Sequence, residues 1–166
     1  MTFTTDRASS QPISLLESVP AAIAAFERLS ADDKLGLLWV IYKKMESGSI
    51  TPAATGAARL QFAEGLLEQV KALEADAQLN FMRDLINRQN TPLTRAYGVL
   101  SNNTKLAFWY RLSELMQSGE VIGVPAYYQI SRPARDVYQR IVSLVFGQQI
   151  TILRKVVVKM GYDPFA

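Results

Sequence analysis

The chain has 166 residues and a net charge of +3, with no cysteine and no histidine. This composition excludes disulfides, zinc sites of the usual kind, thiolate nucleophiles and the commonest general base, so a binding function is favoured over catalysis. The apolar stretches are too short to span a bilayer, and the first residues lack the charged-then-apolar order of a secretion signal. We therefore expect a soluble, intracellular monomer without a transmembrane segment.

Helix start and stop signals along the chain predict an all-α fold. The polar residues 1–12 are expected to form a loosely held arm, and residues 13–166 a single helical domain. The signals predict helices over 18–29 (opening at Ser18-Val-Pro20), 30–48, 51–73 and 75–88, a short helix after Thr91-Pro92, a helix from Asn102 or Asn103 to Gly119, and further helices between Ser131 and Gly161. We expect about eight or nine helices in two interleaved bundles.

An internal repeat relates two halves of the chain. The segment from Lys34 to Gly48 recurs, much altered, from Lys105 to Gly119, at a constant offset of 71 (105 − 34). The apolar positions of the two copies stay in phase, with repeat halves of about 30–90 and 101–161. Two similar bundles leave an interface between them, and ligands bind preferentially in such interfaces.

Aromatic residues are concentrated on the two repeated helices. Leu35, Trp39 and Tyr42 follow at i, i+4 and i+7 and share one face. The second copy has a similar, wider face made of Leu106, Trp109, Tyr110, Ser113 and Met116. Core packing explains any one of these residues. Together with Met82 and the segment 124–128, they indicate a site for a long apolar ligand.

The C-terminal part of the chain is basic. Residues 131–166 contain Arg132, Arg135, Arg140, Arg154, Lys155 and Lys159 but only two acidic residues. Such a face fits an acidic partner, whether protein, nucleic acid or lipid headgroup, although charge alone favours a solvated helix face. The chain lacks the Lys/Arg density of a dedicated nucleic-acid binder, so we expect no nucleic-acid partner.

Several motifs resemble those of a known family. They are Leu37–Tyr42, Asn90–Leu93, Asn103–Leu112, Pro125–Tyr128 and Gly147–Arg154. Together they are similar to the N-terminal helical domain of the cyanobacterial orange carotenoid protein, over nearly the whole chain. We expect this chain to lack the linker and the mixed α/β domain that follow in that protein. The chain therefore resembles the stand-alone paralogues called helical carotenoid proteins.

The resemblance implies one non-covalently bound ketocarotenoid, such as canthaxanthin, echinenone or 3'-hydroxyechinenone, threaded between the bundles. The positions that match the family's pigment contacts are Leu35, Trp39, Tyr42, Gly56, Leu60, Met82, Leu106, Trp109, Tyr110, Ser113, Met116, Val124, Pro125, Tyr128, Thr151 and Val157. Ser113 and Tyr127 replace family glycines, and Leu60 stands where methionine is frequent, so these residues are expected to alter the width and polarity of the site. The family is also associated with chloride binding, which no sequence feature locates.

The resemblance implies a role in light absorption and photoprotection. We favour singlet-oxygen quenching, with quenching of phycobilisome fluorescence, carotenoid carriage and a pigment-free helical adaptor as alternatives. Asn103 and Arg154 match positions that contact partners, so a phycobilisome at the cytoplasmic face of thylakoids, or a separate homologue of the missing C-terminal domain, is an expected partner. An ordinary ion pair is the alternative for Arg154, because its repeat counterpart Arg83 is consistent with a structural role.

Overall fold

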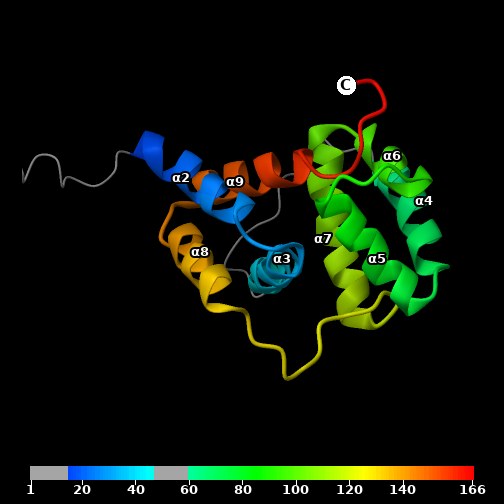
Figure 1. The fold of residues 1–166 in the computed structure, drawn as a ribbon, viewed down its shortest axis with the longest axis horizontal. Helices are drawn as coiled ribbons and strands as arrows, with labels where there is room; N and C mark the ends of the chain where they lie inside the picture. The colour runs from blue at the N-terminus through cyan, green and yellow to red at the C-terminus, as the bar shows by residue number, and fades with distance from the viewer. Residues whose placement is uncertain (1–14, 47–59) are drawn as a thin grey trace, which may run out of the picture.

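The computed structural model describes the backbone of residues 15–46 and 60–166, and the side chains of residues 17–44 and 61–166. Within these ranges the chain forms eight helices and no strand, which confirms the predicted all-α class (Figure 1). The helices are α2 (Leu15–Glu27), α3 (Ala31–Glu46), α4 (Leu60–Lys71), α5 (Ala75–Ile86), α6 (Pro92–Gly98), α7 (Asn102–Ser118), α8 (Arg132–Val142) and α9 (Phe146–Val158).

Local capping explains where several helices begin and end. The hydroxyls of Ser30, Ser101 and Ser131 each accept a hydrogen bond from the backbone N–H three residues later, at 3.1, 3.2 and 3.2 Å. Thr91 caps α6 in the same way, and its capping box is complete. Gly119 ends α7 in the left-handed conformation, with φ of 85°. These boundaries were all predictable from the sequence.

The start of α2 differs from the prediction. Ser18-Val-Pro20 was expected to open this helix, whereas α2 begins at Leu15 and contains Pro20. Proline lacks an N–H, so α2 loses a backbone hydrogen bond at this point. Ala22 and Phe26, each 1% exposed, anchor the helix in the core and offset that loss. The predicted helix end at Gly48 and helix start at Thr51-Pro52 lie outside the described residues.

The helices recur at the offset found in the sequence. α3 and α7 start at Ala31 and Asn102, and α5 and α9 start at Ala75 and Phe146, so that both pairs are 71 residues apart (102 − 31 and 146 − 75). α4 and α8 correspond at their ends, because Lys71 and Val142 are also 71 residues apart (142 − 71).

Equivalent side chains also make equivalent contacts. The side chain of Gln78 donates to the carbonyl of Val70 at 3.1 Å, and its counterpart Gln149 donates to the carbonyl of Ile141 at 3.1 Å. The Lys34 ammonium lies 5.7 Å from the Phe26 ring centroid, and the Lys105 ammonium lies 5.5 Å from that of Tyr97. Phe26 lies on α2 and Tyr97 on α6, so the repeat also relates these two helices. Both residues precede the repeat halves, which start at about residues 30 and 101.

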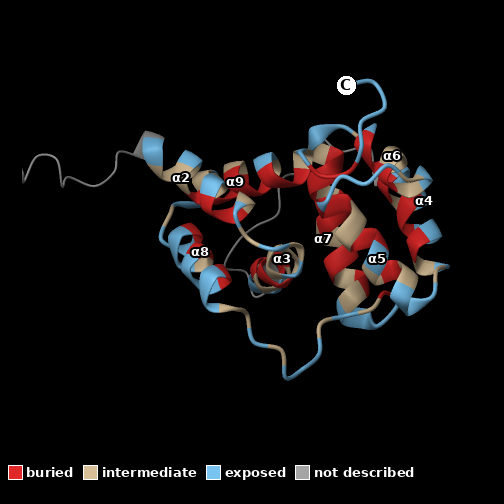
Figure 2. Ribbon diagram, viewed as in Figure 1, coloured by how far each residue is buried: buried red, intermediate tan, exposed pale blue. Residues whose placement is uncertain are grey.

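The two halves exchange helices. α2 and α3 pack with α8 and α9 in a first bundle, and α4, α5, α6 and α7 form a second bundle (Figure 1). The predicted interleaving is therefore confirmed. The bundles meet where α3 packs against α5 and α7, and where α7 packs against α9. We call this interface the seam; the buried residues of its helices face one another, and their exposed residues face outward (Figure 2).

Candidate functional site

A cavity of about 300 Å³ lies at one end of the seam. Its walls come from α3 of the first bundle, α5 and α7 of the second, and the segment after α7. The lining is largely apolar, as expected of a pocket for a small organic ligand. The residues that line it are Asp32, Leu35, Gly36, Leu38, Trp39, Tyr42, Leu79, Met82, Arg83, Trp109, Ser113, Met116, Ile122, Gly123, Val124, Pro125 and Tyr128.

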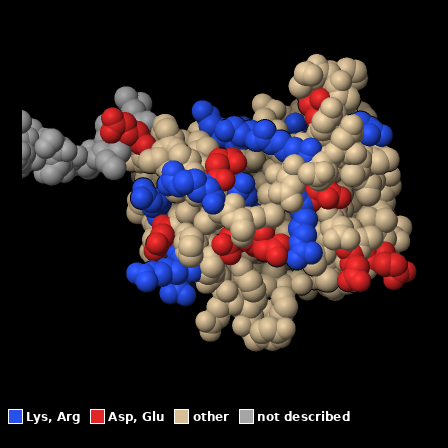
Figure 3. Space-filling model, in the orientation of Figure 1, with Lys and Arg blue, Asp and Glu red and all other residues tan. Residues whose placement is uncertain are grey.

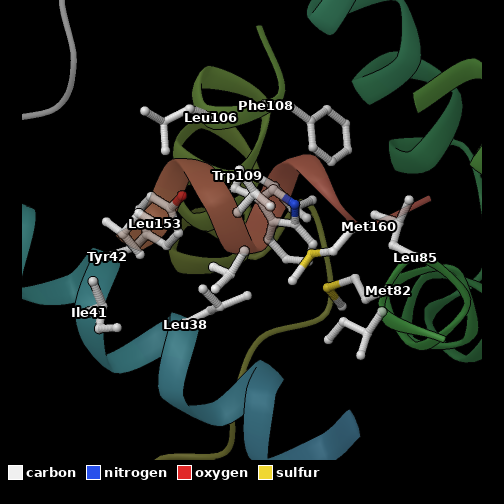
Figure 4. Packing of buried hydrophobic residues seen from close by; sticks show 14 of the residues in the cluster. Leu38, Ile41, Tyr42, Met82, Leu85, Leu106, Phe108, Trp109, Leu153 and Met160 are labelled. Atoms are coloured by element: carbon white, nitrogen blue, oxygen red, sulfur yellow. The ribbon is translucent and has the colours of Figure 1, made fainter. Parts of the chain in front are cut away.

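Trp109 forms the inner wall of this cavity. Its side chain is 3% exposed, and Figure 4 shows it between Leu38 of α3 and Met82 of α5. The indole Nε1 donates to the Tyr97 hydroxyl at 3.0 Å, and that hydroxyl donates to the carbonyl of Val157 at 2.5 Å. This chain of hydrogen bonds satisfies the polar atoms of both rings, so the indole is held rigidly where it lines the cavity.

Tyr42 contributes a buried polar atom that has no partner. Its hydroxyl makes no hydrogen bond although the side chain is 1% exposed, and burial raises the pKa of Tyr42 far above its usual range. Its ring lies 6.5 Å from that of Tyr110 across the seam. A buried hydroxyl without a hydrogen-bond partner lowers the free energy of unfolding. The core accommodates this cost at Tyr42, which lines the cavity.

Tyr42→Phe should therefore stabilise the pigment-free protein by about 1 kcal/mol, because it removes an unsatisfied buried hydroxyl while keeping the ring. Urea unfolding of the ligand-free chain measures this change. A loss of stability of similar size would show that the hydroxyl has a hydrogen-bond partner in solution.

Polar groups gather at the outer edge of the cavity. The carboxylate of Asp32 on α3 accepts hydrogen bonds from Arg83 on α5, with an Nε–Oδ1 distance of 2.8 Å and an Nη2–Oδ2 distance of 3.1 Å. The hydrogen bond from Arg83 lowers the pKa of Asp32. The hydroxyl end of Tyr128 lies against Gly36, where a Cβ atom would collide with it. Burial, followed by the charges of Asp33 and Asp32, raises the pKa of Tyr128.

The structure brings most of the predicted pigment contacts together in this cavity. Those that line it are Leu35, Trp39, Tyr42, Met82, Trp109, Ser113, Met116, Val124, Pro125 and Tyr128. They come from three helices and one loop that the seam places side by side. Their role as pigment contacts stays a prediction.

The remaining predicted contacts lie elsewhere. Leu106 and Tyr110 on α7 are the repeat counterparts of Leu35 and Trp39, so they occupy the equivalent place toward the other end of the seam. Thr151 and Val157 lie on α9, which packs against α7 there. Gly56 and the side chain of Leu60 lie outside the described residues. A ligand that extended along the whole seam would pass both sets.

Sequence reasoning missed several lining residues: Asp32, Gly36, Leu38, Leu79, Arg83, Ile122 and Gly123. Leu38 could have been found, because it lies one turn after Leu35. One expectation was wrong. Tyr127 was predicted to alter the width of the site, but it is 87% exposed and does not line the cavity, because the loop directs it to solvent.

Arg154 differs from its repeat counterpart. Arg83 pairs with Asp32, but the residue equivalent to Asp32 in the second half is Asn103, which has no charge. The Nε atom of Arg154 is buried and has no hydrogen-bond partner. Arg154 borders a groove of about 610 Å³ between α2 and α9, together with Lys155 and Lys159. Among the described residues, Arg154 therefore forms no ordinary ion pair, which was the alternative explanation for this residue.

Comparison with known proteins identifies the family. The family model described as "Orange carotenoid protein, N-terminal" matches residues 13–163. A relative from Nostoc sp. (strain PCC 7120), an orange carotenoid-binding domain-containing protein, is 54% identical over all of this chain and 99% of its own length. The chain belongs to the orange carotenoid protein N-terminal family.

Other members are longer or have solved structures. The orange carotenoid-binding protein of Synechocystis sp. is 49% identical over 87% of this chain, which spans only 45% of that relative. The structure of the Red Carotenoid Protein of Anabaena (Nostoc) sp. PCC 7120 binding canthaxanthin has a TM-score of 0.76 and 38% identity, covering 87% of this chain and 99% of that one. The Orange Carotenoid Protein of the same organism, also binding canthaxanthin, has a TM-score of 0.80 and 47% identity, covering 87% and 46%.

The family is carotenoid-binding and non-enzymatic, which confirms on family grounds that this chain is not an enzyme. The described part of the chain contains no cluster of three or more acidic side chains that could hold a metal ion. In that same part, every helix is too short or too polar to cross a membrane.

Proposed function

We propose that the chain binds one ketocarotenoid non-covalently along the seam and that the complex quenches singlet oxygen. The observation that carries this proposal is the apolar, aromatic-walled cavity between the bundles. Two solved relatives of the same fold bind canthaxanthin, a pigment whose long apolar body suits such a wall. Which ketocarotenoid the chain prefers is part of the proposal, and canthaxanthin is the first candidate.

The residues present fit such a ligand. Trp109, Trp39 and Tyr42 supply flat aromatic surfaces, and Met82 and Met116 supply polarizable side chains that adapt to an irregular shape. The unpaired Tyr42 hydroxyl lies in the same wall. Because α7 and α9 present equivalent residues in the other half, a pigment longer than the cavity would find similar walls farther along the seam.

The protein's contribution is shape rather than acid–base chemistry. A bound carotenoid supplies the polyene that takes up excitation energy and releases it as heat. Trp109, fixed by its hydrogen bond to Tyr97, can hold a flat ligand in one orientation. The buried helices of both bundles exclude water from the inner end of the cavity. Transfer of an apolar ligand from water into this site therefore has a favourable free energy.

Singlet-oxygen phosphorescence tests this function. The pigment-loaded protein should shorten the lifetime of photosensitised singlet oxygen in proportion to its pigment content. The pigment-free chain at the same concentration is the control, because protein side chains alone also react with singlet oxygen. Equal lifetimes with loaded and pigment-free chain would contradict the proposed quenching while leaving pigment binding intact.

Arg154 supports a second candidate, constitutive quenching of phycobilisome fluorescence. Its guanidinium lacks a partner for Nε and borders an open groove beside Lys155 and Lys159. Lys and Arg side chains spread over the first-bundle side of the face in Figure 3, which suits an acidic partner. A location at the cytoplasmic face of thylakoids follows from this candidate. We rank it second because one arginine does not make an interface.

Arg154→Glu separates the two candidates. The substitution should leave pigment binding and singlet-oxygen quenching unchanged, because Arg154 does not line the cavity. Any quenching of isolated phycobilisomes, which we expect to be weak, should disappear in the variant and decrease with salt in the wild type. Arg88→Glu, an equal charge change at an exposed residue after α5, is the control. Strong wild-type quenching lost only in Arg154→Glu would promote the second candidate.

A further inference from the structure

The Asp32–Arg83 ion pair joins the two bundles at the edge of the cavity. Asp32 lies in the first turn of α3 in the first bundle, and Arg83 lies in the last turn of α5 in the second. The two side chains make two hydrogen bonds, at 2.8 and 3.1 Å, between residues 51 positions apart in the sequence. Both residues also line the cavity. A paired contact of this kind fixes the relative position of the two helices better than a single bond does.

The other ion pairs of the described residues stay within one bundle. Lys34 pairs with Glu27 inside the first bundle. The second bundle contains the pairs Lys71–Glu68, Lys71–Glu120, Arg111–Glu64 and Arg111–Glu114. Within the part of the chain that the structure describes, the Asp32–Arg83 pair is thus the ionic contact across the seam.

The opposite end of the seam differs among the described residues. At the equivalent positions of the second half stand Asn103, which carries no charge, and Arg154, whose Nε atom makes no hydrogen bond to the described residues. The two ends of the seam therefore differ among the described residues. One end has the Asp32–Arg83 ion pair between the bundles, and the equivalent described positions at the other end form no ion pair.

We propose that the Asp32–Arg83 ion pair controls pigment exchange, by holding α3 against α5 and so retarding passage of the ligand through this end of the seam. Tyr128 packs beside the pair against Gly36 and narrows the same edge. A rigid apolar ligand can enter or leave here only if α3 and α5 separate or the Tyr128 segment moves. This inference rests on the proposed pigment binding and adds to it the residues that set its kinetics.

The test is the rate at which pigment leaves the loaded protein for an excess of phosphatidylcholine vesicles, followed by sedimenting the vesicles and recording visible absorbance. Asp32→Asn and Arg83→Gln each break the pair with little change in shape. Because the pair is largely exposed, we expect roughly a two- to fivefold faster transfer. The exchanged pair Asp32→Arg/Arg83→Asp should return the rate toward that of the wild type. High salt should accelerate the wild type but not Asp32→Asn.

Glu64→Gln is the matched control. It breaks the Arg111–Glu64 pair, which has the same 2.8 Å distance and similar exposure but lies within the second bundle. Its transfer rate should equal that of the wild type. If Asp32→Asn transfers pigment no faster than Glu64→Gln, the exchange role of the ion pair is wrong, although pigment binding stands. A chain that takes up no pigment at all overturns the proposed function, and this inference with it.

Discussion

Trp109→Ala should both destabilise the protein and abolish firm pigment retention. The side chain is 3% exposed, donates a hydrogen bond to Tyr97 and forms the inner wall of the cavity. Truncating a buried aromatic side chain costs roughly 3–5 kcal/mol. Loss of the indole also enlarges the cavity and removes the flat surface against which a polyene would lie. Urea unfolding measures the first effect, and the pigment-to-protein absorbance ratio of the folded fraction measures the second.

Phe108→Ala is the matched control for Trp109→Ala. Phe108 is the preceding residue of α7, is 0% exposed and packs against the rings of Phe81, Tyr97 and Trp109 at 6.3, 5.2 and 6.2 Å, yet it does not line the cavity. It should lose a similar amount of stability while its folded fraction keeps its pigment. Equal pigment loss in the folded fractions of both variants would mean that Trp109 is an ordinary core residue.

Ser113→Trp should block the site in a protein that still folds. Ser113 is 4% exposed, lines the cavity, and donates a hydrogen bond to the Tyr110 carbonyl of its own helix. An indole at this position would project into the space of about 300 Å³ that the pigment is proposed to fill. We expect the bound pigment to decrease by roughly tenfold or more, because added bulk excludes a ligand more strongly than a lost contact weakens it.

Gln117→Trp places the same side chain one turn later on α7. Gln117 is exposed and does not line the cavity, so this variant should bind pigment as the wild type does. Circular dichroism of both variants checks that the helices are retained. Normal pigment content in folded Ser113→Trp would show that the ligand does not occupy this cavity.

Local sequence signals predicted most of the fold. Serine caps and closing glycines act within one helical turn, and the repeat offset of 71 placed equivalent helices in the two halves. The same offset predicted the seam, because related apolar faces such as those of Leu35 and Leu106 must be buried in equivalent places. The sequence predicted that the two bundles interleave, but not which helices belong to each bundle. That assignment comes from the contacts between the helices.

Features that depend on tertiary contacts were not predictable. Pro20 suggested a helix start, but the burial of Ala22 and Phe26 keeps α2 helical on both sides of it. The partner of Arg83 lies on a different helix, far away in the sequence, so the charge pattern gave no sign of it. Tyr127 and Tyr128 are neighbours of the same type, and only the path of the loop decides that the second one faces the cavity.

The central claim is that the seam holds a carotenoid, and the visible spectrum of the chain purified from a ketocarotenoid-producing host tests it most directly. The protein should be coloured, and extraction should recover about one ketocarotenoid per chain. Illumination with blue light should leave the spectrum unchanged, because the pigment is proposed to stay in one bound position between the two bundles. A colourless protein with a fully helical circular dichroism spectrum would contradict the claim, since the fold would then form without holding pigment.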